Sequence, residues 1–197
     1  MLAQGLTLGT GGNVSVAVED GVAISPSGMA YDDIQPTDVP IVDLDGGVLD
    51  GTRDPSSETA MHTGVHRARE GVGAVVHTHS PYASTFASLA RPIPASHYLI
   101  AFVGNRIPVA GYATYGTQEL ADLALEALGD EYNACLLQNH GVLAVGADGQ
   151  GAFEVALMVE YCARVHYQAL SIGEPTRVPE EEIGRLESKF ADYGQSG

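Results

Sequence analysis

Three histidines have the types and spacing needed to bind one metal ion. His77 and His79 are separated by one residue at the end of an apolar run that is typical of a β-strand. Side chains alternate along a strand, so both imidazoles leave the same face about 7 Å apart and can share an ion. His140 follows a second apolar run and stands beside Gly141. Three histidines with one open position are typical of a catalytic zinc site, so these residues predict metal-assisted catalysis.

Other interpretations of the histidines stay open. A His-x-His pair on a strand can consist of exposed side chains that bind no metal. His62 and His66 are four residues apart, a spacing that also binds metal on a helix. Their segment lacks the glutamate of the His-Glu-x-x-His motif, so we interpret them as polar positions on one helix face. His97 and His166 have no partner at ligand spacing and are assigned to packing or surface roles.

An acidic residue and several hydroxyl groups indicate an anion site with a base beside it. Glu58 follows Ser56 and Ser57 at the expected start of a helix, where free N–H groups attract anions. The serines could hold a phosphate and the carboxylate could act as a general base; an ordinary helix cap is the alternative. The glycine- and hydroxyl-rich loops 9–13 and 25–28 could also present N–H groups to phosphate, although turn formation alone explains such loops.

The pattern of apolar residues places these groups on alternating strands and helices. Strands are expected at residues 13–18, 22–24, 40–44, 48–50, 74–79, 97–103, 107–113, 134–137 and 142–145. Helices are expected at residues 56–70, 81–90, 117–128, 150–170 and 180–190. No repeat or linker divides the chain, so residues 1–197 are expected to form a single domain. We predict an α/β fold of three layers, α/β/α, with a mainly antiparallel central sheet between helices.

Charge, cysteine content and hydropathy limit the partners and the cellular location that we expect for this protein. The 197 residues include 25 acidic and 9 basic side chains, for a formal net charge of −16, which disfavours nucleic acid and anionic membranes as partners. Cys135 and Cys162 lie in apolar runs and are interpreted as reduced core residues. Neither a signal peptide nor an apolar run of membrane-spanning length is found, so we expect a cytoplasmic protein. A halophilic, high-salt cytoplasm would explain the spread acidic charge, and an ordinary acidic enzyme is the alternative.

Five segments, taken in order, resemble the class II aldolase family. They are Gly-Thr-Gly-Gly-Asn-Val-Ser-Val at 9–16, Ser-Pro-Ser-Gly at 25–28, Pro-Ser-Ser-Glu at 55–58, His-Thr-His-Ser at 77–80 and Asn-His-Gly at 139–141. The resemblance covers nearly the whole chain. The family includes L-fuculose-1-phosphate aldolase, L-ribulose-5-phosphate 4-epimerase, a methylthioribulose-phosphate dehydratase and the non-catalytic adducin head domain. A class II aldolase-like domain is therefore the expected fold.

The resemblance implies a role for each matched residue. His77, His79 and His140 match the zinc ligands, although three imidazoles would accept other divalent metals too. Glu58 matches the carboxylate that serves as catalytic acid and base and can also approach the metal. The residues that match the phosphate-binding set are Asn13, Ser27, Gly28, Ser56 and Ser57. The serine at position 27 departs from the usual pattern but keeps a hydroxyl group.

Two tyrosines match groups that the family uses around substrate. Tyr98 matches a catalytic tyrosine that reaches the site of the neighbouring subunit and protonates the aldehyde oxygen. Tyr193 corresponds more loosely to a tail tyrosine that closes over substrate. Family members are typically homotetramers with active sites at subunit interfaces, so the resemblance implies the same assembly. Only nine residues precede Thr10, where the family usually carries a longer N-terminal helix.

The implied reaction is cleavage or formation of a sugar phosphate, a ketose 1-phosphate of the L-fuculose 1-phosphate type, with dihydroxyacetone phosphate and a short aldehyde as products. Zinc would stabilise the enediolate as a Lewis acid. A Schiff base would instead need a lysine in the pocket, and Lys189 in the last expected helix is the only lysine. Glu58 favours an aldolase over the epimerase, which usually has aspartate there, and the dehydratase stays an alternative. An adducin-like module predicts lost metal ligands, and all three are present.

Overall fold

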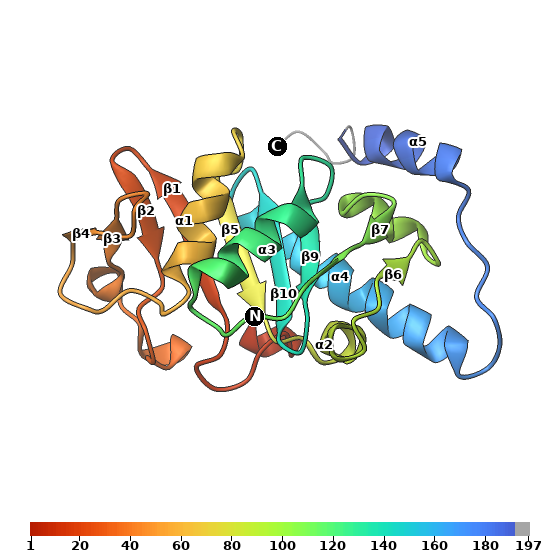
Figure 1. The fold of residues 1–197 in the computed structure, drawn as a ribbon, viewed down its shortest axis with the longest axis horizontal. Coiled ribbons are helices and arrows are strands. Elements are labelled where there is room, and N and C mark those ends of the chain that lie inside the picture. Colours follow the sequence, from red (N-terminus) through yellow and green to blue (C-terminus); the bar gives the residue numbers. More distant parts are fainter. Residues whose placement is uncertain (192–197) are drawn as a thin grey trace.

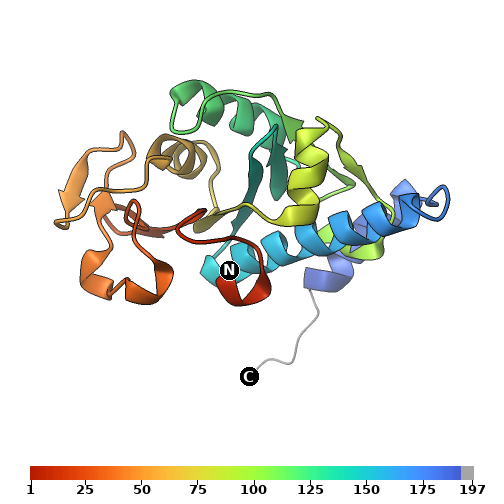
Figure 2. The same cartoon turned by 90° about the horizontal axis from the view of Figure 1, so that it is seen from below.

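A mainly antiparallel sheet lies between two layers of helices in the computed structural model, which describes residues 1–191 (Figures 1 and 2). Within these residues, eight strands form the sheet in the order β4-β3-β2-β1-β5-β10-β9-β8, with the β8–β9 pair parallel and the other pairs antiparallel. The strands of the sheet are β1 (Asn13–Val18), β2 (Gly21–Ile24), β3 (Ile41–Val42), β4 (Val48–Asp50), β5 (Ala74–Thr78), β8 (Val109–Ala110), β9 (Ala134–Leu137) and β10 (Gly141–Gly146). A separate pair consists of β6 (Ile93–Pro94) and β7 (Arg106–Ile107).

The helices cover both faces of the sheet (Figure 2). The α-helices are α1 (Thr59–Ala68), α2 (Pro81–Ser88), α3 (Gln118–Leu128), α4 (Gly149–Leu170) and α5 (Glu180–Ala191). The 3₁₀ helices are η1 (Leu2–Gln4), η2 (Tyr31–Asp33), η3 (Pro36–Asp38) and η4 (Tyr98–Phe102). Alternation along β5 divides the core: Val75 packs in the α1/α3 layer, whereas Ala74 and Val76 pack in the α2/α4 layer. His77 follows Val75 by two residues and therefore faces the α1/α3 side.

The architecture confirms the predicted fold class, and two predicted strands are wrong. Within the predicted strand 97–103 the chain forms η4 instead, and at its start the Leu99 N–H donates a hydrogen bond to Nδ1 of His97 at 3.3 Å. Residues 107–113 do not form one continuous strand, because Pro108 has no N–H group to donate. The chain instead changes partner there, from β6 before the proline to β9 after it.

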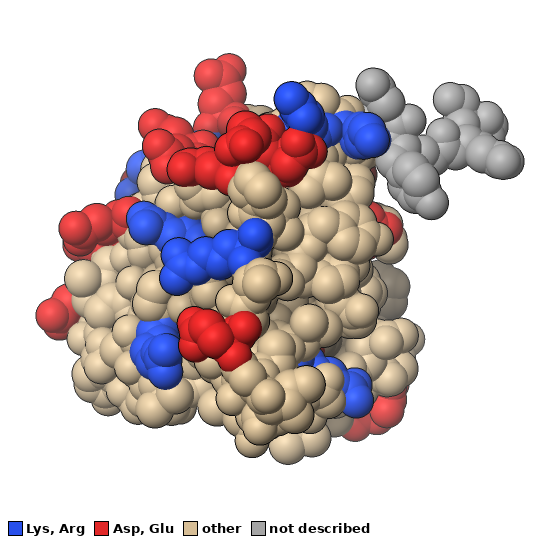
Figure 3. Space-filling view, turned by 90° about the vertical axis from the view of Figure 1, so that its right-hand side faces the viewer, with Lys and Arg blue, Asp and Glu red and all other residues tan. Residues whose placement is uncertain are grey.

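The described surface mixes charges in spite of the acid excess. On the face at the right of Figure 1, acidic and basic side chains lie close together (Figure 3). A groove beside the end of α4 is lined by Arg91, Arg106 and Arg177 together with Glu174 and Glu180. Among residues 1–191, no helix combines the length and apolar character needed to cross a membrane.

Candidate active site

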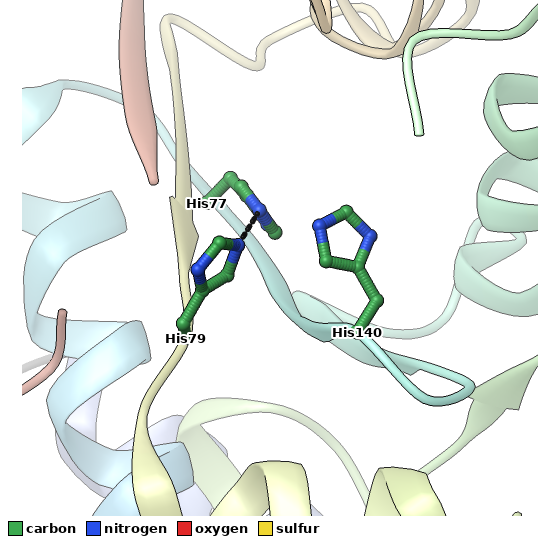
Figure 4. Close-up of side chains that lie close together, drawn as sticks. All are labelled: His77, His79 and His140. Carbon is green, nitrogen blue, oxygen red and sulfur yellow. Dashed lines mark hydrogen bonds between the residues drawn. The ribbon is translucent and has the colours of Figure 1, made fainter. Parts of the chain in front are cut away.

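The three histidines predicted to bind metal come together at one end of the central strands (Figure 4). One ring nitrogen of each lies within 4.8 Å of the others. β5 carries His77 and continues directly into His79, while the tight turn between β9 and β10 carries His140. In that turn the His140 N–H donates to the Leu137 carbonyl at 3.0 Å. Antiparallel pairing of β5 with β10 thus brings two distant parts of the chain to one site.

A backbone hydrogen bond sets which nitrogen of His77 is free. Its Nδ1 lies 2.8 Å from the Val142 carbonyl oxygen, so Nδ1–H donates and Nε2 carries the lone pair. That Nε2 lies 2.9 Å from Nε2 of His79. Burial, followed by the charges of His140 and His79, lowers the pKa of His77 well below 6.5, and burial also lowers the pKa of His79. Both rings are therefore neutral near pH 7 and can offer nitrogen lone pairs to a cation.

Glu58 faces these nitrogens from the N-cap position of α1. Its Oε2 accepts a hydrogen bond from Asn13 Nδ2 at 3.0 Å and lies 3.2 Å from His77 Nε2. Its Oε1 lies 3.6 Å from His140 Nε2 and is buried without a hydrogen-bond partner. Because His77 is neutral, the Glu58–His77 contact is not an ion pair. A buried carboxylate oxygen left unpaired beside converging imidazole nitrogens is costly, and a divalent cation among them would satisfy both.

A pocket of about 390 Å³ adjoins the histidines and is lined by all five residues predicted to bind phosphate. They are Asn13, Ser27, Gly28, Ser56 and Ser57. Two loops supply four of them and lie side by side because the Ser27 N–H donates to the Asp54 carbonyl at 2.9 Å and the Ser56 N–H to the Ser25 carbonyl at 3.1 Å. Gly28 has a φ of +69°, a left-handed conformation that glycine adopts without strain. Hydroxyl groups from separate segments therefore open into one pocket.

The glycine-rich loop 9–13 forms another wall and is braced by a residue that no sequence pattern indicated. The Tyr31 hydroxyl lies 3.0 Å from the Gly11 carbonyl oxygen and 2.7 Å from that of Gly12, and donates its proton there. Burial raises the pKa of Tyr31 to about 12, so this donor stays protonated. A Cβ on Gly12 would lie 2.6 Å from the His77 carbonyl oxygen, so glycine is required for the loop to approach β5 this closely.

Of the tyrosines and the lysine that could act on substrate, one described residue lines the pocket. Tyr115 lines the pocket, although we did not assign it to the site from the sequence. Tyr98 does not line it; this residue begins η4, is 48% exposed and lies against His97 with ring centroids 4.8 Å apart. Lys189 lies on α5 and, within the described residues, is not part of the pocket lining. Tyr193 lies outside the described residues.

This fold and site define a class II aldolase type of protein: the chain belongs to the class II aldolase and adducin N-terminal domain family, whose sequence pattern matches residues 1–167. It is 51% identical to the 5-deoxy-D-ribulose 1-phosphate aldolase of Bacillus thuringiensis serovar kurstaki, over 99% of this chain and 92% of that protein. It is 40% identical to the L-fuculose phosphate aldolase of Escherichia coli O6:H1, over 98% of this chain and 90% of that protein. A solved L-fuculose 1-phosphate aldolase matches with a TM-score of 0.93 and 42% identity, over 96% of this chain and 90% of that one. The chain is therefore an enzyme, a lyase of this family.

Proposed function

We propose that the chain is a zinc-dependent aldolase that cleaves a ketose 1-phosphate to dihydroxyacetone phosphate and a short aldehyde, and joins them in reverse. The observation that carries this proposal is the convergence of His77, His79, His140 and Glu58 beside a pocket walled by glycine and hydroxyl groups, with His79, His140 and Glu58 in its lining. Nitrogen and carboxylate ligands suit zinc, while the ligand types alone would also accept neighbouring divalent metals.

The serine loops are proposed to hold the phosphate group. Ser56 and Ser57 directly precede the N-terminus of α1, and Ser27 and Gly28 lie on the loop paired beside them. Hydroxyl donors and the positive end of the helix dipole both favour a bound phosphate dianion. Phosphate at this end and the histidines at the other would orient the sugar chain along the pocket.

Glu58 is proposed to move the proton at the carbon where the bond breaks. In cleavage, the C3–C4 bond of the ketose breaks, O4 loses its proton and becomes the aldehyde oxygen, and the electron pair moves onto C3 as an enediolate. A bound divalent metal would supply the Lewis acid that lowers the energy of this negative charge. The proton of O4 passes to Tyr98 and the protonated form of Glu58 gives its proton to C3, after which exchange with solvent returns both groups to their starting states. In synthesis the Glu58 carboxylate removes the proton from C3. The position of Lys189 on α5 disfavours a Schiff-base route.

Tyr98 is proposed to exchange the proton at the aldehyde oxygen in the site of a neighbouring copy. Its exposure of 48% and its position away from the pocket of its own chain support that role. We propose a homotetramer with interfacial sites, as implied by the family resemblance. A cytoplasmic location is a further proposal, and so is a high-salt cell interior, which the net charge of −16 supports.

The substrate that we propose first is 5-deoxyribulose 1-phosphate, because the 51%-identical relative is named for it. The similarity to L-fuculose phosphate aldolases supports L-fuculose 1-phosphate as the second candidate. Cleavage of the first would release acetaldehyde, and cleavage of the second would release lactaldehyde.

Direct assay of both substrates tests this function. The zinc-loaded protein is incubated with each ketose 1-phosphate, and dihydroxyacetone phosphate and the aldehyde are measured by mass spectrometry. We expect cleavage of at least one substrate and joining of dihydroxyacetone phosphate to the matching aldehyde in reverse. A product that has lost water would indicate a dehydratase, and an isomer without cleavage would indicate an epimerase. Either result in place of cleavage, or no product from any short aldehyde, would contradict the proposal.

A further inference from the structure

A chain of buried hydrogen bonds runs from Glu58 into the layer between β1 and α1. Asn13 and Ser15 alternate along β1, so their side chains leave the same face about 7 Å apart. His62 and His66 are four residues apart on α1, a rise of about 6 Å along the same helix face. Because the two spacings match, the polar side chains of strand and helix can meet in pairs. The helix face that we interpreted as merely polar thus lies against the sheet.

Each link of this chain is within hydrogen-bond distance. Asn13 Nδ2 lies 3.0 Å from Glu58 Oε2, and Asn13 Oδ1 lies 2.5 Å from His62 Nε2. His62 Nδ1 lies 2.7 Å from Ser15 Oγ, which lies 2.9 Å from His66 Nε2. Asn13, Ser15 and His62 are all buried, with His62 at 0% exposure. The interior of the molecule therefore carries one continuous polar connection to the proposed catalytic carboxylate.

The chemistry of the groups determines which atom donates in each link from Glu58 to Ser15. Asn13 gives an amide N–H to Glu58, so its Oδ1 is an acceptor and the His62 Nε2 must carry a proton. Burial lowers the pKa of His62 to about 3, so the ring is neutral and its Nδ1 must accept from the Ser15 hydroxyl. The last contact, 2.9 Å between Ser15 Oγ and His66 Nε2, extends the chain to His66. Reversal of any link between Glu58 and Ser15 would place two acceptors or two donors face to face.

We propose that His62 is a positioning residue: by donating from Nε2 to Asn13, it fixes the amide so that its N–H holds Oε2 of Glu58 and Oε1 stays directed toward the histidines. The role rests on the proposed function, in which Glu58 moves the proton at C3. Without the His62 donor the Asn13 amide can turn over, and its oxygen would then repel the carboxylate. In this geometry the Asn13 N–H₂ group is directed to Glu58, and the phosphate is left to Ser27, Gly28, Ser56 and Ser57. These four residues lie outside the His62–Asn13 link, so substrate binding and turnover should respond differently.

Three variants separate positioning from a general structural role. His62→Leu should lower kcat about 10- to 100-fold with KM nearly unchanged and zinc still bound, a loss of the size known for groups that orient metal-site residues. His62→Gln should restore most of kcat, because its amide can donate to Asn13 and accept from Ser15. Thr63→Val is the matched control: Thr63 is 3% exposed on the same helix and its hydroxyl bonds back to the Ala60 carbonyl at 3.5 Å, so kcat should not change. Wild-type kcat in His62→Leu, or equal loss in His62→Leu and His62→Gln, would overturn the proposal.

The direction of the hydrogen bonds can be read without any activity. In protein labelled with ¹⁵N-histidine, the two-bond couplings of the His62 ring report which nitrogen carries the proton. We expect the Nε2–H tautomer in the substrate-free wild-type protein. A Nδ1–H tautomer would overturn the proposal even if every variant folds poorly. An absence of ketose 1-phosphate cleavage by the wild-type protein would refute the proposed function instead, and the tautomer would still decide the direction of the chain.

Discussion

Replacement of Glu58 by glutamine should separate stability from catalysis. The side chain is 5% exposed, and its two oxygens have unequal surroundings. Oε2 accepts from Asn13 at 3.0 Å, whereas Oε1 is buried without a hydrogen-bond partner and lies 3.6 Å from His140 Nε2. Glutamine has the same shape, so its oxygen can keep the Asn13 hydrogen bond. Its amide N–H₂ group then occupies the place of the unpaired oxygen.

The expected change in stability follows from the unpaired Oε1 atom of Glu58. An unsatisfied buried polar group costs about 1–3 kcal/mol, and more when it is charged. An amide donor that faces imidazole nitrogens removes part of this cost, so metal-free Glu58→Gln should be more stable than metal-free wild type by about 1 kcal/mol. An amide cannot move a proton to or from carbon, so kcat should fall about 100- to 10,000-fold.

Two measurements on the same preparations check this prediction. Urea unfolding of the metal-free proteins, followed by circular dichroism, gives the difference in the free energy of unfolding. Steady-state cleavage of 5-deoxyribulose 1-phosphate by the zinc-loaded proteins gives kcat. Turnover of the variant within about threefold of wild type would refute the role of Glu58 as acid and base, since loss of such a group costs at least about 100-fold. A variant less stable than wild type by about 1 kcal/mol or more would refute the reasoning on the unpaired oxygen.

Three other predictions concern the assembly, the interior and the surface. If Tyr98 acts in a neighbouring site, mixing the inactive Tyr98→Phe and Glu58→Gln proteins so that they exchange subunits should give more activity than either protein alone. No gain in activity would mean that Tyr98 acts in the same chain as Glu58. The pKa of His62 is lowered from 6.5 to about 3, so its stability contribution is complete above pH 6.5 and is lost as the pH falls toward 3. The free energy of unfolding should fall by about 1.4 kcal/mol per pH unit over this range, which urea unfolding at a series of pH values will measure. His62→Gln should show a smaller fall, and an equal pH dependence in wild type and variant would contradict the prediction. Added salt should raise the thermal midpoint because counter-ions screen the net charge of −16, and an unchanged midpoint would argue against surface self-repulsion.

Local patterns predict part of the metal cluster. Alternation along one strand is enough to place His77 and His79 on the same face. The position of His140 depends on the register of β10 against β5, in which Leu143 pairs with His77, and no local pattern encodes that register. The apolar run before His140 made it a candidate for the third ligand, and the family resemblance then matched all three histidines to one metal site.

Local patterns also failed where tertiary packing decides the outcome. The spacing of His62 and His66 predicts a shared helix face, but it does not tell which layer that face meets. In the structure this face lies against Asn13 and Ser15 of β1, and His62 is fully buried. The alternation of polar residues at 13 and 15, taken together with the helix spacing, is the signal that could have indicated the pairing. The strand predicted at residues 97–103 was wrong for the same reason, because an apolar run indicates burial but does not distinguish a strand from a 3₁₀ helix.

Removal and return of the metal tests the central proposal most directly. The wild-type protein is stripped with a chelator and titrated with zinc, while bound zinc and cleavage of 5-deoxyribulose 1-phosphate and L-fuculose 1-phosphate are measured together. His77→Ala serves as the control that lacks one proposed ligand. We predict no turnover by the metal-free protein and activity that rises until about one zinc is bound per chain, as expected for a single catalytic site. Full turnover without metal, or zinc that binds equally well to His77→Ala, or bound zinc that restores no cleavage of either substrate, would contradict the account.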